Sequence, residues 1–197
     1  VDIGESSLRE FGSWPWPRSQ VALLSQRLAA YGVSKQIFDI VFEAPRDDDA
    51  VLAAALSASP SVIAQVFVLD HGAAVASGSL IGGVLKPPCP AAWPKAVGYV
   101  APAAVLGVGA AGHITPRIDS DGAVRRMPAM VCYQGLGYPA LPLVGLMPVG
   151  PGSLELIPGD ALLDPSYRLT VGKKGSGVPV SASGDVRIPY RIHPDGV

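Results

Sequence analysis

The first seventy residues alternate between apolar stretches of helical period and of strand-like composition. After Ser19, apolar residues recur at the spacing of one helix face, and Gly32 suits the end of that helix. The runs 36–42 and 61–69 are rich in β-branched and aromatic residues and predict buried strands. Between them, three aspartates at 47–49 precede an alanine-rich stretch, and carboxylates favour the start of a helix. Apolar strands separated by helices predict a parallel sheet with right-handed crossovers.

Towards the C-terminus the pattern changes from helix-linked strands to hairpins. Residues 71–95 show no period, which predicts a long loop. Extended runs at 112–116 and 123–133 flank an Asp-Gly pair, which is typical of a hairpin turn. The predicted fold class is therefore α/β, a mixed sheet with a parallel N-terminal part flanked by helices and with C-terminal antiparallel hairpins. The other expected elements are helices or helical turns at 5–11, 101–106 and 138–147, and short strands at 154–157, 168–171, 178–181 and 186–192.

Composition narrows the classes of protein to which the chain can belong. It has 197 residues, enough for one domain, and its 15 lysines and arginines nearly balance 16 aspartates and glutamates. The lack of a basic excess argues against a nucleic-acid partner. Neither 96–112 nor 127–147 is uniformly apolar over the roughly 20 residues of a spanning helix. Because the chain starts with Val1 rather than Met, we expect one domain, 1–197, that is a piece of a longer protein.

Several short motifs match known sites only in part. Residues 107–112 have the glycines of a dinucleotide-binding loop, but Pro116 follows where a helix has to begin. Residues 172–177 have the composition of a phosphate-binding loop in the wrong order. Residues 119–122 resemble the start of a calcium loop that lacks its distal glutamate. We therefore expect no cofactor, no bound metal and no catalytic residue.

Cys89 and Cys132 are the two cysteines of the chain. In an oxidising compartment they can form a disulfide that closes a loop of about 40 residues, worth roughly 3–4 kcal/mol. The alternative is a pair of buried thiols that pack as small hydrophobic groups. A zinc site that adds His113 to the two cysteines lacks the ligand spacing of known structural sites.

Polar residues next to apolar segments predict a structural network. Asp39 interrupts an otherwise apolar strand, and a buried carboxylate needs a partner. Arg18 follows two Trp-Pro pairs, which cannot lie inside a helix. We predict that Arg18 pairs with Asp39 and braces a rigid turn. In this turn the indoles of Trp14 and Trp16 cap the core; an exposed aromatic platform for a ligand is the alternative.

Charged residues of the predicted hairpin are the candidates for ligand binding. Open α/β sheets bind ligands at the carboxyl ends of parallel strands, so we expect 42–47 and 69–72 to line the rim of a cleft. Adjacent strand residues face opposite sides, so one of Arg125 and Arg126 should face solvent and the other the sheet or the cleft. Together with Asp121, these arginines would favour a small anionic ligand.

Six features follow one another along the chain: 2–8, 12–18 with Trp-Pro-Trp-Pro-Arg, 38–42, Asp49 before an alanine-rich stretch, 119–128 with Asp-x-Asp-Gly-x-Val-Arg-Arg, and 185–191. Together they resemble the type-two CHASE domain, the sensory extracellular module associated with cyclases and histidine kinases. The resemblance implies an extracytoplasmic (periplasmic) sensor domain, not an enzyme, of a bacterial membrane receptor. It also implies a small-molecule ligand, flanking transmembrane helices, and a cytoplasmic output that is an adenylate cyclase, a diguanylate cyclase or a kinase.

Two functions of other classes stay open at this point. A secreted hydrolase would use paired carboxylates among Glu5, Asp39 and Asp121, and would bring them together in a cleft. A dimerisation module without a ligand would form a homodimer through a large apolar interface.

Overall fold

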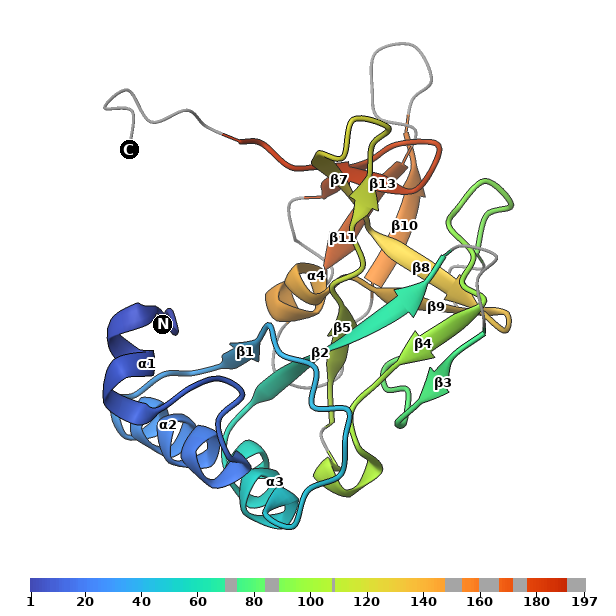
Figure 1. The fold of residues 1–197 in the computed structure, drawn as a ribbon. Coiled ribbons are helices and arrows are strands. Elements are labelled where there is room, and N and C mark those ends of the chain that lie inside the picture. Colours follow the sequence, from blue (N-terminus) through green and yellow to red (C-terminus); the bar gives the residue numbers. More distant parts are fainter. Residues whose placement is uncertain are drawn as a thin grey trace.

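A mixed sheet forms the N-terminal part of the molecule, and smaller antiparallel sheets form the C-terminal part (Figure 1). The computed structural model describes residues 1–69, 74–83, 89–107, 109–147, 154–159, 167–171 and 177–190. The α/β class and the division into a partly parallel region and a hairpin region confirm the prediction. Within these ranges, no helix has both the length and the apolarity that crossing a membrane requires.

The central strand of the larger sheet is β2 (Ser61–Val68). β1 (Gln36–Phe38) pairs parallel with the start of β2, and β5 (Ala111–His113) pairs parallel with its middle. β4 (Gly98–Val100) pairs antiparallel with the end of β2, and β3 (Ala76–Ser77) lies parallel to β4. One apolar strand thus holds both the parallel and the antiparallel parts of the sheet.

Helices cover both faces of this sheet. α2 (Arg18–Ala30) and α3 (Asp49–Ser57) pack on one face, where their apolar residues meet Phe38 and other inward residues of the strands. α4 (Leu141–Leu146) packs on the other face, against Val62 and Ala64 of β2. The remaining helical elements are α1 (Glu5–Phe11) and the short turn η1 (Ala104–Leu106).

A second hydrophobic core lies under the C-terminal hairpins. Trp93, Met130, Leu143 and Leu169 belong to it, so it joins a loop, a hairpin, helix α4 and a C-terminal strand. The small sheets are β8 (Met130–Tyr133) with β9 (Leu136–Pro139), β10 (Leu154–Pro158) with β11 (Tyr167–Val171) and β12 (Val178–Val180), and β6 (Arg117–Ile118) with β7 (Val124–Pro128) and β13 (Asp185–Arg187).

Several predicted boundaries differ from those of the structure. The strand expected at 36–42 ends at Phe38, and the chain then leaves the sheet. The extended run 123–133 is divided at Ala129 into two strands, β7 and β8. β7 pairs with β13, whereas β8 pairs with β9. The helix expected at 138–147 begins only at Leu141, because residues 136–139 belong to β9. The expected loop at 71–95 contains β3, and residues 191–192 of the last expected strand lie outside the described residues.

Candidate functional site

The hairpin of β6 and β7 carries a dense group of charged side chains, and its geometry depends on a β-bulge. Arg117 pairs with Arg126, whereas the next residue of β6, Ile118, pairs with Val124. Arg125 is therefore an extra residue in β7, and such a residue breaks the regular alternation of side chains. Arg125 and Arg126 consequently reach the same carboxylate, which corrects the prediction that they face opposite sides.

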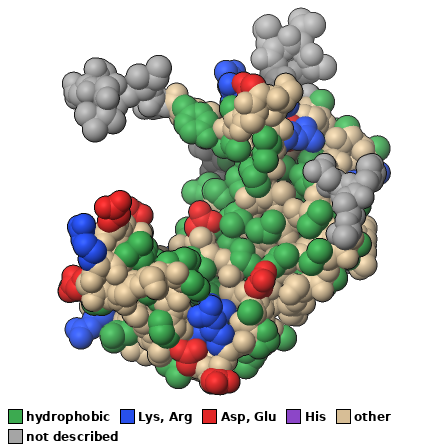
Figure 2. Space-filling view, in the orientation of Figure 1, with side chains coloured by type: hydrophobic (Ala, Val, Ile, Leu, Met, Phe, Trp, Pro, Cys, Tyr) green, Lys and Arg blue, Asp and Glu red, His purple; other side chains and the backbone are tan. Residues whose placement is uncertain are grey.

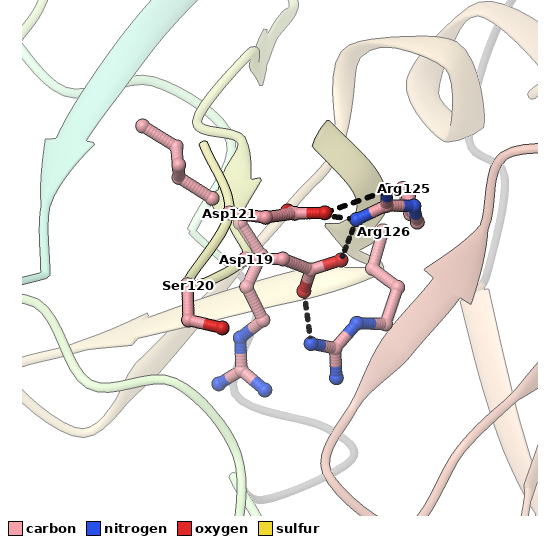
Figure 3. A pocket seen from close by; sticks show the side chains of 7 residues that line it. Asp119, Ser120, Asp121, Arg125 and Arg126 are labelled. Atoms are coloured by element: carbon pink, nitrogen blue, oxygen red, sulfur yellow. Dashed lines mark hydrogen bonds and ion pairs between the residues drawn. The ribbon is translucent and has the colours of Figure 1, made fainter. Parts of the chain in front are cut away.

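Two aspartates of the turn hold these arginines (Figure 3). The guanidinium of Arg125 donates to both oxygens of Asp121, from Nη1 at 2.9 Å and from Nη2 at 2.8 Å. Arg125 Nη1 also lies 3.3 Å from Asp119 Oδ2, while Arg126 Nη2 donates to Asp119 Oδ1. These hydrogen bonds lower the pKa of Asp119, mainly through Arg126, and lower the pKa of Asp121, mainly through Arg125. Arg125, Arg126 and Asp121 are exposed and Asp119 is half-buried, so salt screens the Arg125–Asp121 pair most.

A buried carboxylate supports the hairpin from β13. Asp185 is 4 % exposed, and its Oδ2 accepts hydrogen bonds from Arg117 Nη1 and from Ser183 Oγ, each at 2.8 Å. Arg126 Nη1 lies 3.8 Å from the same oxygen. Asp185 thereby fixes the charged ends of β6 and β7 to the edge of the second core.

Three arginines stand side by side across this sheet, and we call Arg117, Arg126 and Arg187 the arginine row. The register places Arg126 opposite Arg117 on one side and opposite Arg187 on the other. Like charges directly opposite one another are destabilising, so the row needs nearby anions. Asp185 forms an ion pair with Arg117, and both Asp119 and Asp185 form ion pairs with Arg126. Within the described ranges no ion pair reaches Arg187.

The segment that follows β13 is tied to the same hairpin. The Ile188 N–H donates to the Arg125 carbonyl at 3.0 Å, and the Tyr190 hydroxyl donates to the Val124 carbonyl at 2.8 Å. A shift of the backbone at the bulge would therefore be passed directly to residues 188–190.

The predicted rim and the arginines do not form one site. The pocket that Arg125 and Arg126 line contains no residue of 42–47. Residues of that segment instead bind the start of α2 and the turn before it: the Ala44 carbonyl accepts from Arg18 Nη2, and Arg46 Nη1 donates to the Trp16 carbonyl. Of the second expected rim segment, residues 70–72 lie outside the described part of the chain.

Arg18 pairs with Asp49 and not, as predicted, with Asp39. Arg18 Nε lies 2.9 Å from Asp49 Oδ1, both side chains are buried, and the guanidinium stacks 4.7 Å from the centre of the Phe42 ring. Asp39 is exposed because Phe38, its neighbour in the extended chain, points into the core. Asp49 lies inside because it starts α3 directly beside the start of α2.

The tryptophan turn supports the same contact between α2 and α3. Trp16 is buried, and its Nε1 donates to the Gly12 carbonyl at 2.8 Å. Trp14 remains 42 % exposed and lies with its ring 5.9 Å from that of Trp16. One indole therefore caps the core as expected, whereas the other lines a surface groove.

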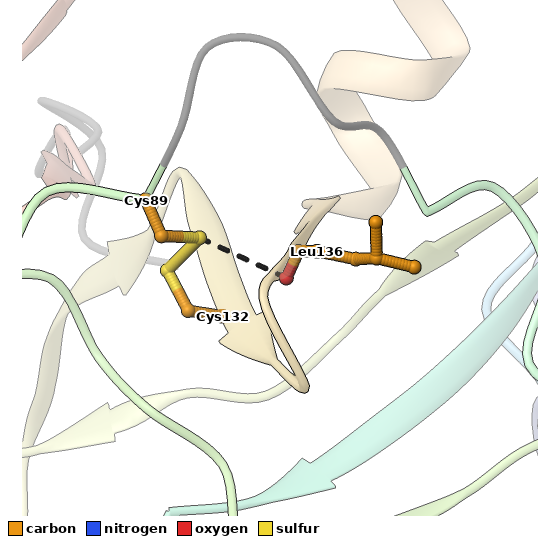
Figure 4. Close-up of a disulfide and its surroundings, with 3 residues drawn as sticks. All are labelled: Cys89, Cys132 and Leu136. Atoms are coloured by element: carbon orange, nitrogen blue, oxygen red, sulfur yellow. Dashed lines mark hydrogen bonds between the residues drawn. A yellow bond between two sulfur atoms is a disulfide. The ribbon is translucent and has the colours of Figure 1, made fainter.

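Cys89 and Cys132 form a disulfide in the structure, across a sequence separation of 43 residues (Figure 4). Cys132 is buried in β8, and Cys89 Sγ lies 3.7 Å from the Leu136 carbonyl oxygen of β9. Gly137 lies opposite Cys132 and leaves room for Met130, whose sulfur would be 2.2 Å from an added Cβ. The disulfide thus ties the loop before Trp93 to the β8–β9 hairpin.

The carboxylates of the hydrolase alternative are not brought together. Asp121 lines the pocket of the charged hairpin, Asp39 lines the groove beside β1, and Glu5 lines neither. No group of three metal-ligating side chains occurs among the residues that the structure describes.

Four residues of the site had not been singled out: Arg117, Asp119, Asp185 and Arg187. Asp119 belongs to the Asp-x-Asp-Gly phrase, and that phrase could have identified it. Arg117 and Arg187 are seventy positions apart in the chain, and only the strand register places them on either side of Arg126.

Comparison with known proteins identifies the family of the chain. The family model described as the CHASE2 domain matches residues 1–195. Neither the curated proteins nor the solved structures contain a match to the chain.

Proposed function

This chain belongs to the CHASE2 domain family, a family of extracellular sensory domains, and we propose that it is the sensor of a bacterial transmembrane receptor. In this proposal the domain lies outside the cytoplasmic membrane and flanking transmembrane helices connect it to a cytoplasmic cyclase or kinase. A disulfide between Cys89 and Cys132 supports this location, because disulfides persist in oxidising compartments. The domain itself carries the signal and performs no chemistry.

The observation that supports signalling most directly is the connection between the charged hairpin and residues 188–190. A sensor works by shifting an equilibrium between two conformations, and its ligand must bind one of them better. In the described conformation Asp119 and Asp121 occupy the guanidinium groups of Arg125 and Arg126. A ligand that takes their place would move the bulge and, through the Arg125 carbonyl, the segment that leads on from β13.

We assign the ligand to the class of small anions. Carboxylates and phosphates bind guanidinium groups through paired, charge-assisted hydrogen bonds. The arginine row together with Arg125 carries four positive charges against three on Asp119, Asp121 and Asp185. An anion in the pocket would compete with Asp121 for Arg125 and would add negative charge beside Arg117 and Arg126.

A thermal-shift screen of small anionic metabolites tests this assignment. A ligand at 100 times its Kd adds about 2.7 kcal/mol to the free energy of unfolding, which raises the melting temperature measurably. The rise should be absent in the double variant Arg125→Ala, Arg126→Ala and should persist in Arg27→Ala, an exposed arginine of α2. A rise that is equal in all three proteins would show that the anion binds elsewhere.

The location is tested separately in the parent receptor. A reporter enzyme that is active only outside the cytoplasm, fused after Val197 with the preceding chain kept, should show activity. Activity of a cytoplasm-only reporter at the same position would contradict the proposed topology.

A further inference from the structure

Within the part of the chain that the structure describes, β1 is an edge strand, and one side of its backbone faces no other strand. The Gln36 N–H donates to the Pro60 carbonyl, so Gln36 and Phe38 direct their backbone groups towards β2. Backbone groups alternate along a strand, so those of Lys35, Ile37 and Asp39 point away from β2. Among the described residues no strand pairs with this side of β1.

A groove of about 900 Å³ runs along this edge. Residues 1–3 also line it, and its apolar lining includes Trp14, Leu24, Leu28 and Val33. In Figure 2, apolar side chains gather on the inner side of the N-terminal helices, where the surface is hollowed. Ile37, which also lines the groove, is 50 % exposed, although it is the middle residue of a strand.

The charges of the groove differ between the two ends of β1. Lys35 Nζ donates to the Gly145 carbonyl at 2.9 Å and to the Met147 carbonyl, which leaves one of its three N–H groups for another acceptor. Asp39 is exposed, and no hydrogen bond or ion pair to its carboxylate occurs within the described ranges. Asp2 adds a second carboxylate to the lining.

We propose that this groove binds an extended peptide that adds an antiparallel strand to β1. Such β-augmentation uses main-chain hydrogen bonds for affinity and alternate side chains for specificity. The residue opposite Ile37 exchanges both main-chain hydrogen bonds with it. A basic residue stands opposite Asp39 and an acidic residue opposite Lys35. The two residues between these positions point towards the α2 face and the apolar lining.

The preferred peptide therefore has the pattern basic, apolar, apolar, apolar, acidic, read from its N-terminus. This inference goes beyond the proposed function, because the groove and the pocket of the charged hairpin have no lining residue in common. The anion site can therefore be correct if the groove binds no peptide, and the groove can bind a peptide if the anion site is wrong.

The test uses the acetylated peptide Lys-Val-Ile-Leu-Glu, extended at both ends by Gly-Ser, and the 197-residue chain. Trp14 lies in the groove, whereas Trp16 and Trp93 are buried, so tryptophan fluorescence should report saturable binding. N-methylation of the peptide isoleucine removes the hydrogen-bond donor opposite Ile37 and should abolish binding. The reversed peptide, which would have to pair parallel to meet the same charges, should bind more weakly.

Two variants of the protein locate the binding on β1. Ile37→Pro removes an N–H that points away from β2, a position that proline tolerates in an edge strand, and should abolish binding without unfolding. Its control, Ile37→Ala, should retain binding. Asp39→Lys should raise the Kd about tenfold, and exchange of the peptide lysine for glutamate should restore binding.

Binding that is indifferent to Ile37→Pro, to Asp39→Lys and to N-methylation would overturn the proposal, as would no binding by any of the peptides. A concentration-dependent dimer that Ile37→Pro dissolves, found without peptide binding, would equally overturn it and would make a second copy of the chain the occupant of the groove. If Ile37→Pro fails to fold, the N-methyl peptide and the Asp39→Lys charge exchange still test whether the peptide binds along β1.

Discussion

Asp39 and Asp49 show how local geometry decides which carboxylate is buried. Asp39 follows an apolar segment and was predicted to point inward, but Phe38 takes the inward position at the end of β1. Asp49 is 2 % exposed and accepts from Arg18 Nε and from the Arg46 N–H. The choice between the two aspartates depends on how α3 lies against α2, and no pattern within either segment contains that information.

Asp49→Ala should lower the free energy of unfolding by about 3–5 kcal/mol, because it leaves the buried guanidinium of Arg18 without its counter-charge. Asp39→Ala should change it by no more than about 0.5 kcal/mol, as for other exposed positions. Urea unfolding followed by circular dichroism measures both. Equal losses in the two variants would contradict Asp49 as the counter-charge of the buried Arg18.

The buried His113 should make the free energy of unfolding depend on pH, in a range that begins above the titration of most carboxylates. Its ring is fully buried beside Phe67, and burial lowers its pKa from 6.5 to about 3, partly opposed by the Pro128 carbonyl. The unfolded chain therefore binds a proton that the folded chain does not, so stability falls as the pH drops from 6.5 towards 3.

The slope expected from His113 is up to about 1.4 kcal/mol per pH unit. Between pH 6.5 and 4.5, His113→Asn should lack this slope, while its amide oxygen can still accept from the Thr115 N–H as Nδ1 does at 3.3 Å. Unfolding at several pH values compares the two proteins. A slope that is identical in both would assign the pH dependence to other groups.

At the scale of elements, the hydrophobic pattern predicted best where an element packs along its whole length. α2, α3 and β2 lie close to their expected positions, because each buries one face against the first core, and β2 also buries its other face against α4. β9 was missed, since its four residues include a glycine and a proline and gain their order from pairing with β8. The bulge at Arg125 was also missed, because an extra residue in a strand leaves no mark in composition.

The turn before β13 offers a prediction at this scale. Gly184 and Gly122 share a backbone φ of +81°, but a Cβ at Gly184 would lie 2.8 Å from the ring of Trp93, whereas nothing lies within 4 Å at Gly122. Gly122→Ala should cost about 1–2 kcal/mol from the left-handed conformation alone.

Gly184→Ala should cost more than that, because Trp93 is buried in the second core and has no room to move. Thermal unfolding of the two variants measures the difference. Equal costs would show that the Trp93 ring shifts freely, which would contradict the close packing of the turn on the core.

At the scale of the whole molecule, the sequence predicted the fold class but not how the first and second hydrophobic cores divide the chain. The second core joins residues from Trp93 to Val180, and those contacts depend on tertiary packing of short strands. The sequence singled out part of the charged hairpin, through the Asp-x-Asp-Gly phrase and the two adjacent arginines. Its third strand, β13, could not be assigned to it from the sequence, since nothing near Arg187 indicates which strand it pairs with.

The disulfide should stabilise the molecule as a whole. Closure of a loop of 43 residues restricts the unfolded chain by about 3–4 kcal/mol. The double variant Cys89→Ala, Cys132→Ala should lose about that much in urea unfolding, and so should the native chain under reducing conditions. The reductant should leave the double variant unchanged; an effect there would mean that it acts by another route.

β2 lies between one strand that precedes it in the sequence and one that follows it, and this order has a consequence during synthesis of the chain. β1 precedes it, whereas β5 begins only at Ala111. Until that residue is made, a strand of eight residues without a charge or a proline keeps one edge open. Open, uncharged strands of this kind recruit one another into aggregates. A chain that ends before Ala111 is therefore expected to be insoluble, and complete translation protects β2 by placing it inside the sheet.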